Sequence, residues 1–125
     1  MTVHVWFKQP ADRLSLNDRM HWAPKAKLTA AWREAARIAA RESLSAKGEH
    51  AERCTVRVTF PVTQNRRRDP HNAIATVKPI VDGFVDAGVW PDDTDEWVIV
   101  LDPRFDKRND GIVTVDITPM PETTA

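Results

Sequence analysis

Alternation of apolar and polar residues marks four segments of the chain as strands. "VHVWF" alternates over residues 3–7 and "RCTVRVTF" over 53–60. "EWVIVLD" (96–102) and "GIVTVDIT" (111–118) add two strands near the end, joined by "PRFDKRND" with Gly111 at the turn. Because successive side chains of a strand point to opposite faces, each segment can cover a core with one face.

Two other segments carry helical spacing. Residues 27–44 are rich in Ala, Arg and Glu and place apolar residues every three or four positions. The second helix begins at Asp69 and Pro70, since Asp caps free amides and Pro fits the first turn. It ends near Gly88. Pro79 lies inside it, which predicts a kink or a restart at that point.

The order strand, helix, strand, helix, strand, strand predicts one small α/β (α+β) domain over residues 1–118. We expect a mixed four-stranded sheet with two main helices packed on one side of it, a long loop over residues 8–25 and a flexible C-terminal tail over residues 119–125. The lone Cys54 is expected to be a buried strand residue. With no secretory leader and no apolar run of about 20 residues, we expect a cytoplasmic protein that makes no membrane contact.

Charge is balanced in total but not along the chain. Eighteen basic and 18 acidic residues cancel, yet residues 1–68 hold 14 basic and 6 acidic residues and residues 69–125 hold 4 and 12. This asymmetry predicts separate basic and acidic surfaces, or two halves that attract each other. Arg33, Arg37 and Arg41 recur every four residues and form one stripe, which is either a solvated face or a surface for DNA.

The boundary between the two halves lies in "RRRDPHNAIATVKPIVDGFVDAGVWPDD", residues 66–93. Four acids within five positions repel one another unless they are solvated or hold a cation, and oxygen ligands suit Mg²⁺ or Mn²⁺ rather than zinc. Both interpretations of the acids stay open at this point. The polar residues of the stretch are the run Arg66, Arg67 and Arg68 before Asp69, the helix face His71, Lys78 and Asp82, and the acids Asp92, Asp93, Asp95 and Glu96.

This arrangement resembles the RusA family of Holliday-junction resolvases. The family pattern is an arginine run, D-x-D-N, K-x-x-x-D on a helix, and A-G-(apolar)-W-x-D-D. By this resemblance Asp69 corresponds to the first aspartate, Asn72 to the asparagine, Lys78 to the lysine, Asp82 to the aspartate four residues later and Asp93 to the second acid of the pair. His71 stands in place of the second carboxylate of D-x-D-N, and "NAIATVK" is two residues longer than usual.

The resemblance implies a homodimeric, Mg²⁺-dependent endodeoxyribonuclease, with Mn²⁺ as a substitute, that nicks four-way DNA junctions on two symmetric strands. It also implies a phage or prophage protein acting in the bacterial cytoplasm. Phe84, Trp90 and Trp97 belong either to the core or to the dimer interface. The expected catalytic residues are Asp69, Lys78, Asp82 and Asp93, the expected metal ligands are Asp69, His71, Asp82, Asp92 and Asp93, and the expected DNA contacts are Arg33, Arg37, Arg66, Arg67, Arg68 and Asn72.

Other functions fit parts of the same pattern. A non-catalytic protein that binds branched DNA is favoured by His71 at a carboxylate position. A phosphohydrolase acting on small nucleotides would share the metal site but would not need the arginine run. A purely structural domain would leave the grouping of Arg, Asp and Lys residues without a role.

Overall fold

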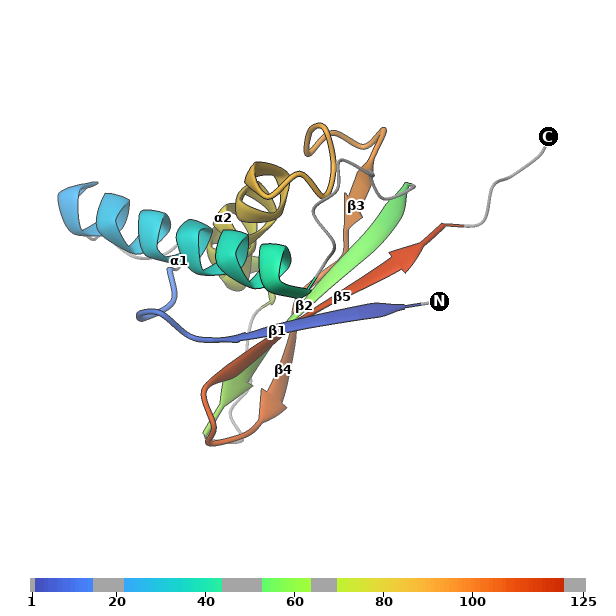
Figure 1. The fold of residues 1–125 in the computed structure, drawn as a ribbon. Helices are drawn as coiled ribbons and strands as arrows, with labels where there is room; N and C mark the ends of the chain where they lie inside the picture. The colour runs from blue at the N-terminus through green and yellow to red at the C-terminus, as the bar shows by residue number, and fades with distance from the viewer. Residues whose placement is uncertain (1, 15–21, 44–52, 64–69, 121–125) are drawn as a thin grey trace.

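The computed structural model describes residues 2–14, 22–43, 53–63 and 70–120 (Figure 1). These residues form a small α/β domain with one mixed sheet and two helices, as predicted. The elements in chain order are β1 (Val3–Lys8), α1 (Trp22–Ser43), β2 (Cys54–Val62), α2 (Pro70–Asp86), β3 (Val98–Val100), β4 (Arg104–Lys107) and β5 (Ile112–Pro119).

The sheet is built around β2, its longest strand. The strand order is β1-β5-β2-β3, and β4 also pairs with β2. β5 lies antiparallel to both β1 and β2, whereas β3 and β4 run parallel to β2. β3 pairs with the first three residues of β2 and β4 with the last four, so two short strands share one edge of β2.

The strand β4 corrects the prediction of a four-stranded sheet, because it lies in the segment expected to be a connection. Phe105 of β4 stands opposite Phe60 of β2 in the register, and the two rings lie 6.2 Å apart. Pro103, just before β4, has no N–H to donate to a neighbouring strand, which separates β3 from β4. One half-buried Phe among charged residues was too weak a pattern to predict this strand.

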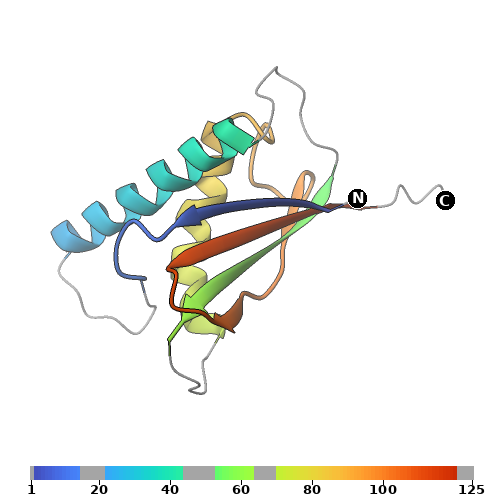
Figure 2. The same cartoon turned by 60° about the horizontal axis from the view of Figure 1, so that its bottom comes forward.

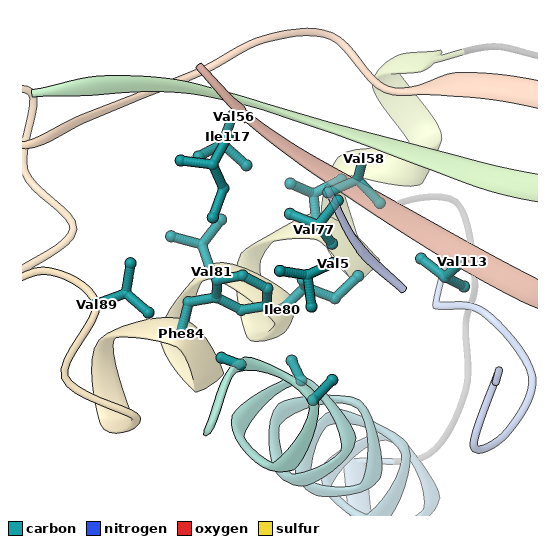
Figure 3. Close-up of a cluster of buried hydrophobic side chains, with 14 of the residues drawn as sticks. Val5, Val56, Val58, Val77, Ile80, Val81, Phe84, Val89, Val113 and Ile117 are labelled. Carbon is teal, nitrogen blue, oxygen red and sulfur yellow. The ribbon is translucent and has the colours of Figure 1, made fainter. Parts of the chain in front are cut away.

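Both helices cover the same face of the sheet, as the two views of the fold show (Figures 1 and 2). The strands present alternate residues to this layer, and all the large side chains of β2 that face it are buried. Figure 3 shows Val56 and Val58 of β2 among the apolar side chains of α2, which include Val77 and Val81. Cys54 is 1% exposed within this core, as predicted. Phe84 and Trp90 are also 1% exposed, which assigns them to the core rather than to a dimer interface.

The loop before α1 is shorter than predicted, because α1 begins at Trp22. Pro24 lies in the first turn of the helix, where a missing N–H costs no hydrogen bond. The described part of the loop is fixed to the helices: the Leu14 N–H donates to Thr76 Oγ1 at 2.9 Å, and the Trp32 Nε1–H donates to the Asp12 carbonyl at 2.9 Å. Asp12 and Leu14 are therefore fixed to α1 and α2 respectively.

The second helix continues through Pro79, so the predicted restart there is wrong. Pro79 is buried, and its neighbour Ile80 is fully buried in the core. Packing on this side holds the helix despite the lost backbone hydrogen bond. The helix ends as predicted near Gly88, whose φ of 88° allows the Val89 N–H to reach the Phe84 carbonyl at 3.1 Å.

The first two residues of the predicted C-terminal tail belong to the sheet. β5 runs through Pro119, and the Met120 N–H donates to the Arg53 carbonyl at 2.8 Å, so the described end of the chain is still part of the sheet. The rest of the predicted tail, residues 121–125, lies outside the described residues.

No helix in the described part of the chain is both long enough and apolar enough to cross a membrane.

Candidate active site

The exposed face of α2 carries the first half of the site. Lys78 and Asp82 are four residues apart, one above the other on this face. The Lys78 ammonium donates to Asp82 Oδ1 at 3.0 Å. The Lys78 side chain is 62% exposed and that of Asp82 is 25% exposed. The sequence-based placement of both residues on one helix face is confirmed for this pair.

The second half of the site comes from the segment after α2. The cap at Gly88 turns the chain back, and Val89 and Trp90 anchor it in the core. Asp93 then lies beside the middle of α2, where its carboxylate accepts a hydrogen bond from the Lys78 ammonium. A returning loop, and not a break at Pro79, therefore brings an acid of the D-D pair to the lysine.

Lys78, Asp82 and Asp93 form a group that we call the Lys78 cluster. The pKa of Lys78 lies above its ordinary value, mainly because of its hydrogen bond to Asp93 and, after that, because of its pairing with Asp82. The hydrogen bond from Lys78 likewise holds the pKa of Asp93 below its ordinary value. Two carboxylates share one ammonium, so the cluster holds more acidic than basic groups.

A second ion pair on α2 involves Arg33 of α1. Its guanidinium binds Asp86 through two hydrogen bonds, Nε to Oδ2 at 2.6 Å and Nη2 to Oδ1 at 2.8 Å. A further Arg33 nitrogen lies 4.0 Å from Asp82 Oδ2. The pairing raises the pKa of Arg33 and lowers the pKa of Asp86. We call Arg33 and Asp86 the interhelical pair; it borders the Lys78 cluster at Asp82.

Gly83 makes this contact between the helices possible. A Cβ atom at Gly83 would lie 2.3 Å from the Arg33 carbonyl oxygen and 2.9 Å from the Cβ of Ala36. Only glycine lets the two backbones approach so closely at this point. The sequence pattern did not identify Gly83. A glycine within a helix predicts only lower helix stability, and its role in helix packing is visible only once α1 is placed beside it.

The arginine stripe of α1 is partly occupied by contacts within the protein. Arg33 binds Asp86, and Arg37 binds Glu34 three residues earlier, with Nε 3.0 Å from Oε2. The hydrogen bond from Arg37 holds the pKa of Glu34 below its ordinary value. The structure thus places the two predicted DNA contacts of this helix in ion pairs, whereas Arg41 has no ion-pair partner among the described residues.

A pocket of about 260 Å³ opens beside the Lys78 cluster. Its wall is mainly apolar, and Lys78 and Asp93 supply its polar edge. Val100, at the end of β3 and 39% exposed, closes the side that faces the sheet edge. The pocket is lined by Ile74, Val77, Lys78, Val81, Asp93 and Val100. Lys78 and Asp93 therefore border an open space rather than the core.

The described residues bring two of the predicted metal ligands together, Asp82 and Asp93. No group of three or more His, Cys, Asp or Glu side chains comes together within the described ranges. Asp82 and Asp93 nevertheless bind the same ammonium, and carboxylate oxygens are the ligands that Mg²⁺ and Mn²⁺ prefer. Asp92 is exposed and accepts the Asp93 N–H at 2.8 Å, which fixes it beside the cluster. Asp92 thus lies beside the two carboxylates without completing a group of three among the described residues.

The remaining predicted site residues are not placed. Arg66, Arg67, Arg68 and Asp69 lie outside the described residues, between the end of β2 and the start of α2. His71 and Asn72 belong to the first turn of α2, and their side chains also lie outside the described part. The predicted contributions of these six residues stay predictions.

Comparison with known proteins gives no match: neither a protein-family model nor a curated protein sequence corresponds to this chain. The resemblance to the RusA resolvases rests on the motif residues alone.

Proposed function

We propose that this protein is a Mg²⁺-dependent endodeoxyribonuclease that nicks four-way DNA junctions on two symmetric strands, as its resemblance to the RusA family implies. One observation supports this above the others. Lys78 and Asp93 belong to separate motifs, 15 residues apart in the chain, and they meet at a single hydrogen bond beside a pocket.

The chemistry of the Lys78 cluster suits phosphodiester hydrolysis. A bound Mg²⁺ or Mn²⁺ would lower the pKa of the attacking water and neutralise charge on the phosphate. Asp82 and Asp93 would hold that ion, with Asp69, His71 and Asp92 as further ligands. The Lys78 ammonium, which keeps its proton at neutral pH, would donate to a phosphate oxygen as negative charge develops there.

Contacts to the DNA backbone fall to residues before α2. Arg33 and Arg37 already bind carboxylates of the protein. We therefore assign phosphate binding to Arg66, Arg67 and Arg68 before α2 and to Asn72 in its first turn. The phosphates of DNA need these cations, and the metal ion that acts on them needs the neighbouring acids. This accounts for the position of the arginine run directly before Asp69.

The two-fold symmetry of a four-way junction calls for a two-fold dimer of the protein. In this proposal the homodimer acts in the bacterial cytoplasm and resolves recombination or replication intermediates of a phage or prophage. Sedimentation of the protein at micromolar concentration should give a dimer, and a monomer both alone and with junction DNA would contradict this part of the proposal.

The direct test is a nicking assay on a synthetic four-way junction and on linear duplex, each with Mg²⁺, Mn²⁺ or a chelator. We expect metal-dependent paired nicks in the junction alone, and their loss in Asp93→Asn. Asp95→Asn is the matched control, because Asp95 is an exposed acid of the same loop outside the Lys78 cluster. A fully active Asp93→Asn variant would refute the proposed site.

A protein that binds branched DNA without cutting it is the second candidate. It is favoured by the ion pairs of Lys78, since the ammonium already occupies one carboxylate oxygen of Asp82 and one of Asp93. Titration with Mn²⁺ by calorimetry separates the two functions. Binding of Mn²⁺ that is lost in Asp93→Asn supports the nuclease, whereas tight junction binding with no Mn²⁺ uptake and no nicks supports the non-catalytic protein.

A further inference from the structure

The face of the sheet that the helices leave uncovered carries an exposed aromatic residue. α1 and α2 both lie on the other side, and none of the described elements lies over this face (Figures 1 and 2). Trp6 of β1 alternates with buried Val5, so its indole points to the uncovered side. Its exposed fraction of 63% is the highest among the large apolar side chains described.

Trp6 is the first residue of a row that crosses four strands. The register pairs Trp6 with Thr114 of β5, Thr114 with Thr59 of β2, and Thr59 with Arg104 of β4. Paired residues of neighbouring strands point to the same face. An indole, two hydroxyl groups and a guanidinium therefore follow one another across the open face over about 14 Å, at a strand spacing of about 4.8 Å.

Three cations of this face have no ion-pair partner among the described residues, whereas one of its acids accepts a hydrogen bond. Lys8, Arg57 and Arg104 have no ion-pair partner among the described residues. Asp116, which the register places between His4 and Arg57, accepts a hydrogen bond from the His4 ring. Asp106, two residues after Arg104, is the other described acid that the register places on this face. Arg104 thus ends the Trp6 row and Lys8 and Arg57 lie beside it, all three without an ion-pair partner among the described residues.

We infer that the open face of the sheet binds single-stranded DNA, with one base stacked on Trp6 and the backbone held by Arg57 and Arg104. Aromatic side chains stack on any base, and cations beside them bind the phosphates. Thr59 and Thr114 supply hydroxyl groups that donate to or accept from a base edge. The choice of DNA rests on the proposed function, whereas the choice of an unpaired strand rests on the exposed indole.

The row also leads toward the candidate active site. It starts at β1, one edge of the sheet, and ends at β4, which shares the opposite edge with β3. Val100 at the end of β3 lines the pocket of the Lys78 cluster. A strand that crosses the open face from Trp6 to Arg104 therefore reaches the edge that β3 and β4 share, and the pocket lies on the helix side of this same edge. A second copy of the chain suits this face less well, because like cations would meet across a symmetric contact.

The test measures binding of a short fluorescent oligothymidine by anisotropy, in chelator so that no strand is cut. We expect Trp6→Ala to weaken binding roughly tenfold or more, since base stacking contributes this much, and Trp6→Phe to retain most of it. Arg57→Gln/Arg104→Gln should lower the dependence of log K on log salt by about 1.4. Lys25→Gln/Lys27→Gln, which removes two charges from α1, should leave Trp6-dependent binding unchanged.

Equal oligothymidine affinity of the wild type and Trp6→Ala would overturn the inference, and so would the absence of binding by the wild type. A dimer that Trp6→Ala converts to a monomer, with oligothymidine affinity unchanged, would overturn it in favour of a second copy on this face. Junction nicking is assayed separately. Trp6-dependent oligothymidine binding without nicking would refute the proposed function alone, whereas nicking without Trp6-dependent binding would refute the inference alone.

Discussion

Two groups of ion pairs lie on neighbouring turns of α2, and they differ in how their charges are matched. In the interhelical pair, the planar guanidinium of Arg33 meets the carboxylate of Asp86 with two hydrogen bonds, one cation to one anion. In the Lys78 cluster, one ammonium serves the carboxylates of Asp82 and Asp93 at the edge of a pocket. The first group joins two helices, and the second joins a helix to a loop.

This difference indicates which group is structural and which is suited to chemistry. A bidentate Arg–carboxylate pair has fixed geometry, and arginine keeps its charge at any pH at which the protein is folded. A lysine with two acids leaves negative charge that a divalent cation can satisfy, and its flexible stem lets the ammonium move to a new partner. We therefore expect substitutions in the Lys78 cluster to affect cleavage and substitutions in the interhelical pair to affect stability.

The largest effect should follow from Lys78→Met. Loss of a group that stabilises transition-state charge should lower junction nicking about a hundredfold. The free energy of unfolding should change by less than about 0.5 kcal/mol, because Lys78 is mainly exposed. Nicking rates and urea denaturation measure the two quantities. The control is Lys25→Met on α1; nicking by Lys78→Met at the wild-type rate would remove Lys78 from the site.

Gly83→Ala tests the helix contact that underlies the interhelical pair. Helix propensity alone predicts that alanine stabilises the protein by about 1 kcal/mol. The Arg33 carbonyl oxygen lies 2.3 Å from where the new Cβ would be, so we expect a loss of about 1–3 kcal/mol instead. Urea denaturation gives the sign directly. A stabilised variant would show that α1 and α2 can separate at this point at little cost.

Arg33→Met should have a smaller effect on stability than Gly83→Ala. The Arg33 side chain is 49% exposed, and exposed ion pairs contribute between about 0.2 and 1 kcal/mol to stability. Junction nicking should stay within about threefold of the wild type, since Arg33 binds Asp86 rather than substrate. A hundredfold loss of nicking without unfolding would instead place Arg33 in the active site.

The smallest effect concerns the pH dependence of stability. Arg33 lowers the pKa of Asp86 in the folded state, so the pair stabilises the fold fully above the unfolded value of about 3.9. This stabilisation is lost as the pH falls through the folded pKa. The difference in unfolding free energy between the wild type and Asp86→Asn should therefore shrink between about pH 6 and pH 2. A difference that stays constant over this range would show that the pair does not form in solution.

Much of the fold was predictable because apolar periodicity is a local property of the sequence. It gave β1, β2, β5 and both helices within a few residues of their observed bounds. The short strand β4 and the start of α1 at Trp22 were missed. β4 depends on a partner distant in the chain, because it is held by its pairing with β2. The first turn of α1 carries Pro24 and no apolar period, so the pattern gave no helix there.

The candidate site was predictable only where the spacing was helical. Lys78 and Asp82 follow from a four-residue separation. The approach of Asp93 was expected only in outline, because it depends on the cap at Gly88 and on the burial of Trp90. The interhelical pair joins residues 53 positions apart and requires a glycine at the crossing, so no local pattern could have predicted it.

The most direct test compares two acids of α2 and its following loop that both bind a cation of the protein. Junction nicking in Mg²⁺ should be measured for Asp93→Asn and for Asp86→Asn at equal folded concentration. We predict that Asp93→Asn loses nicking by about a hundredfold or more while Asp86→Asn stays close to the wild type. Equal losses in the two variants, or full activity in Asp93→Asn, would contradict the assignment of catalysis to the Lys78 cluster.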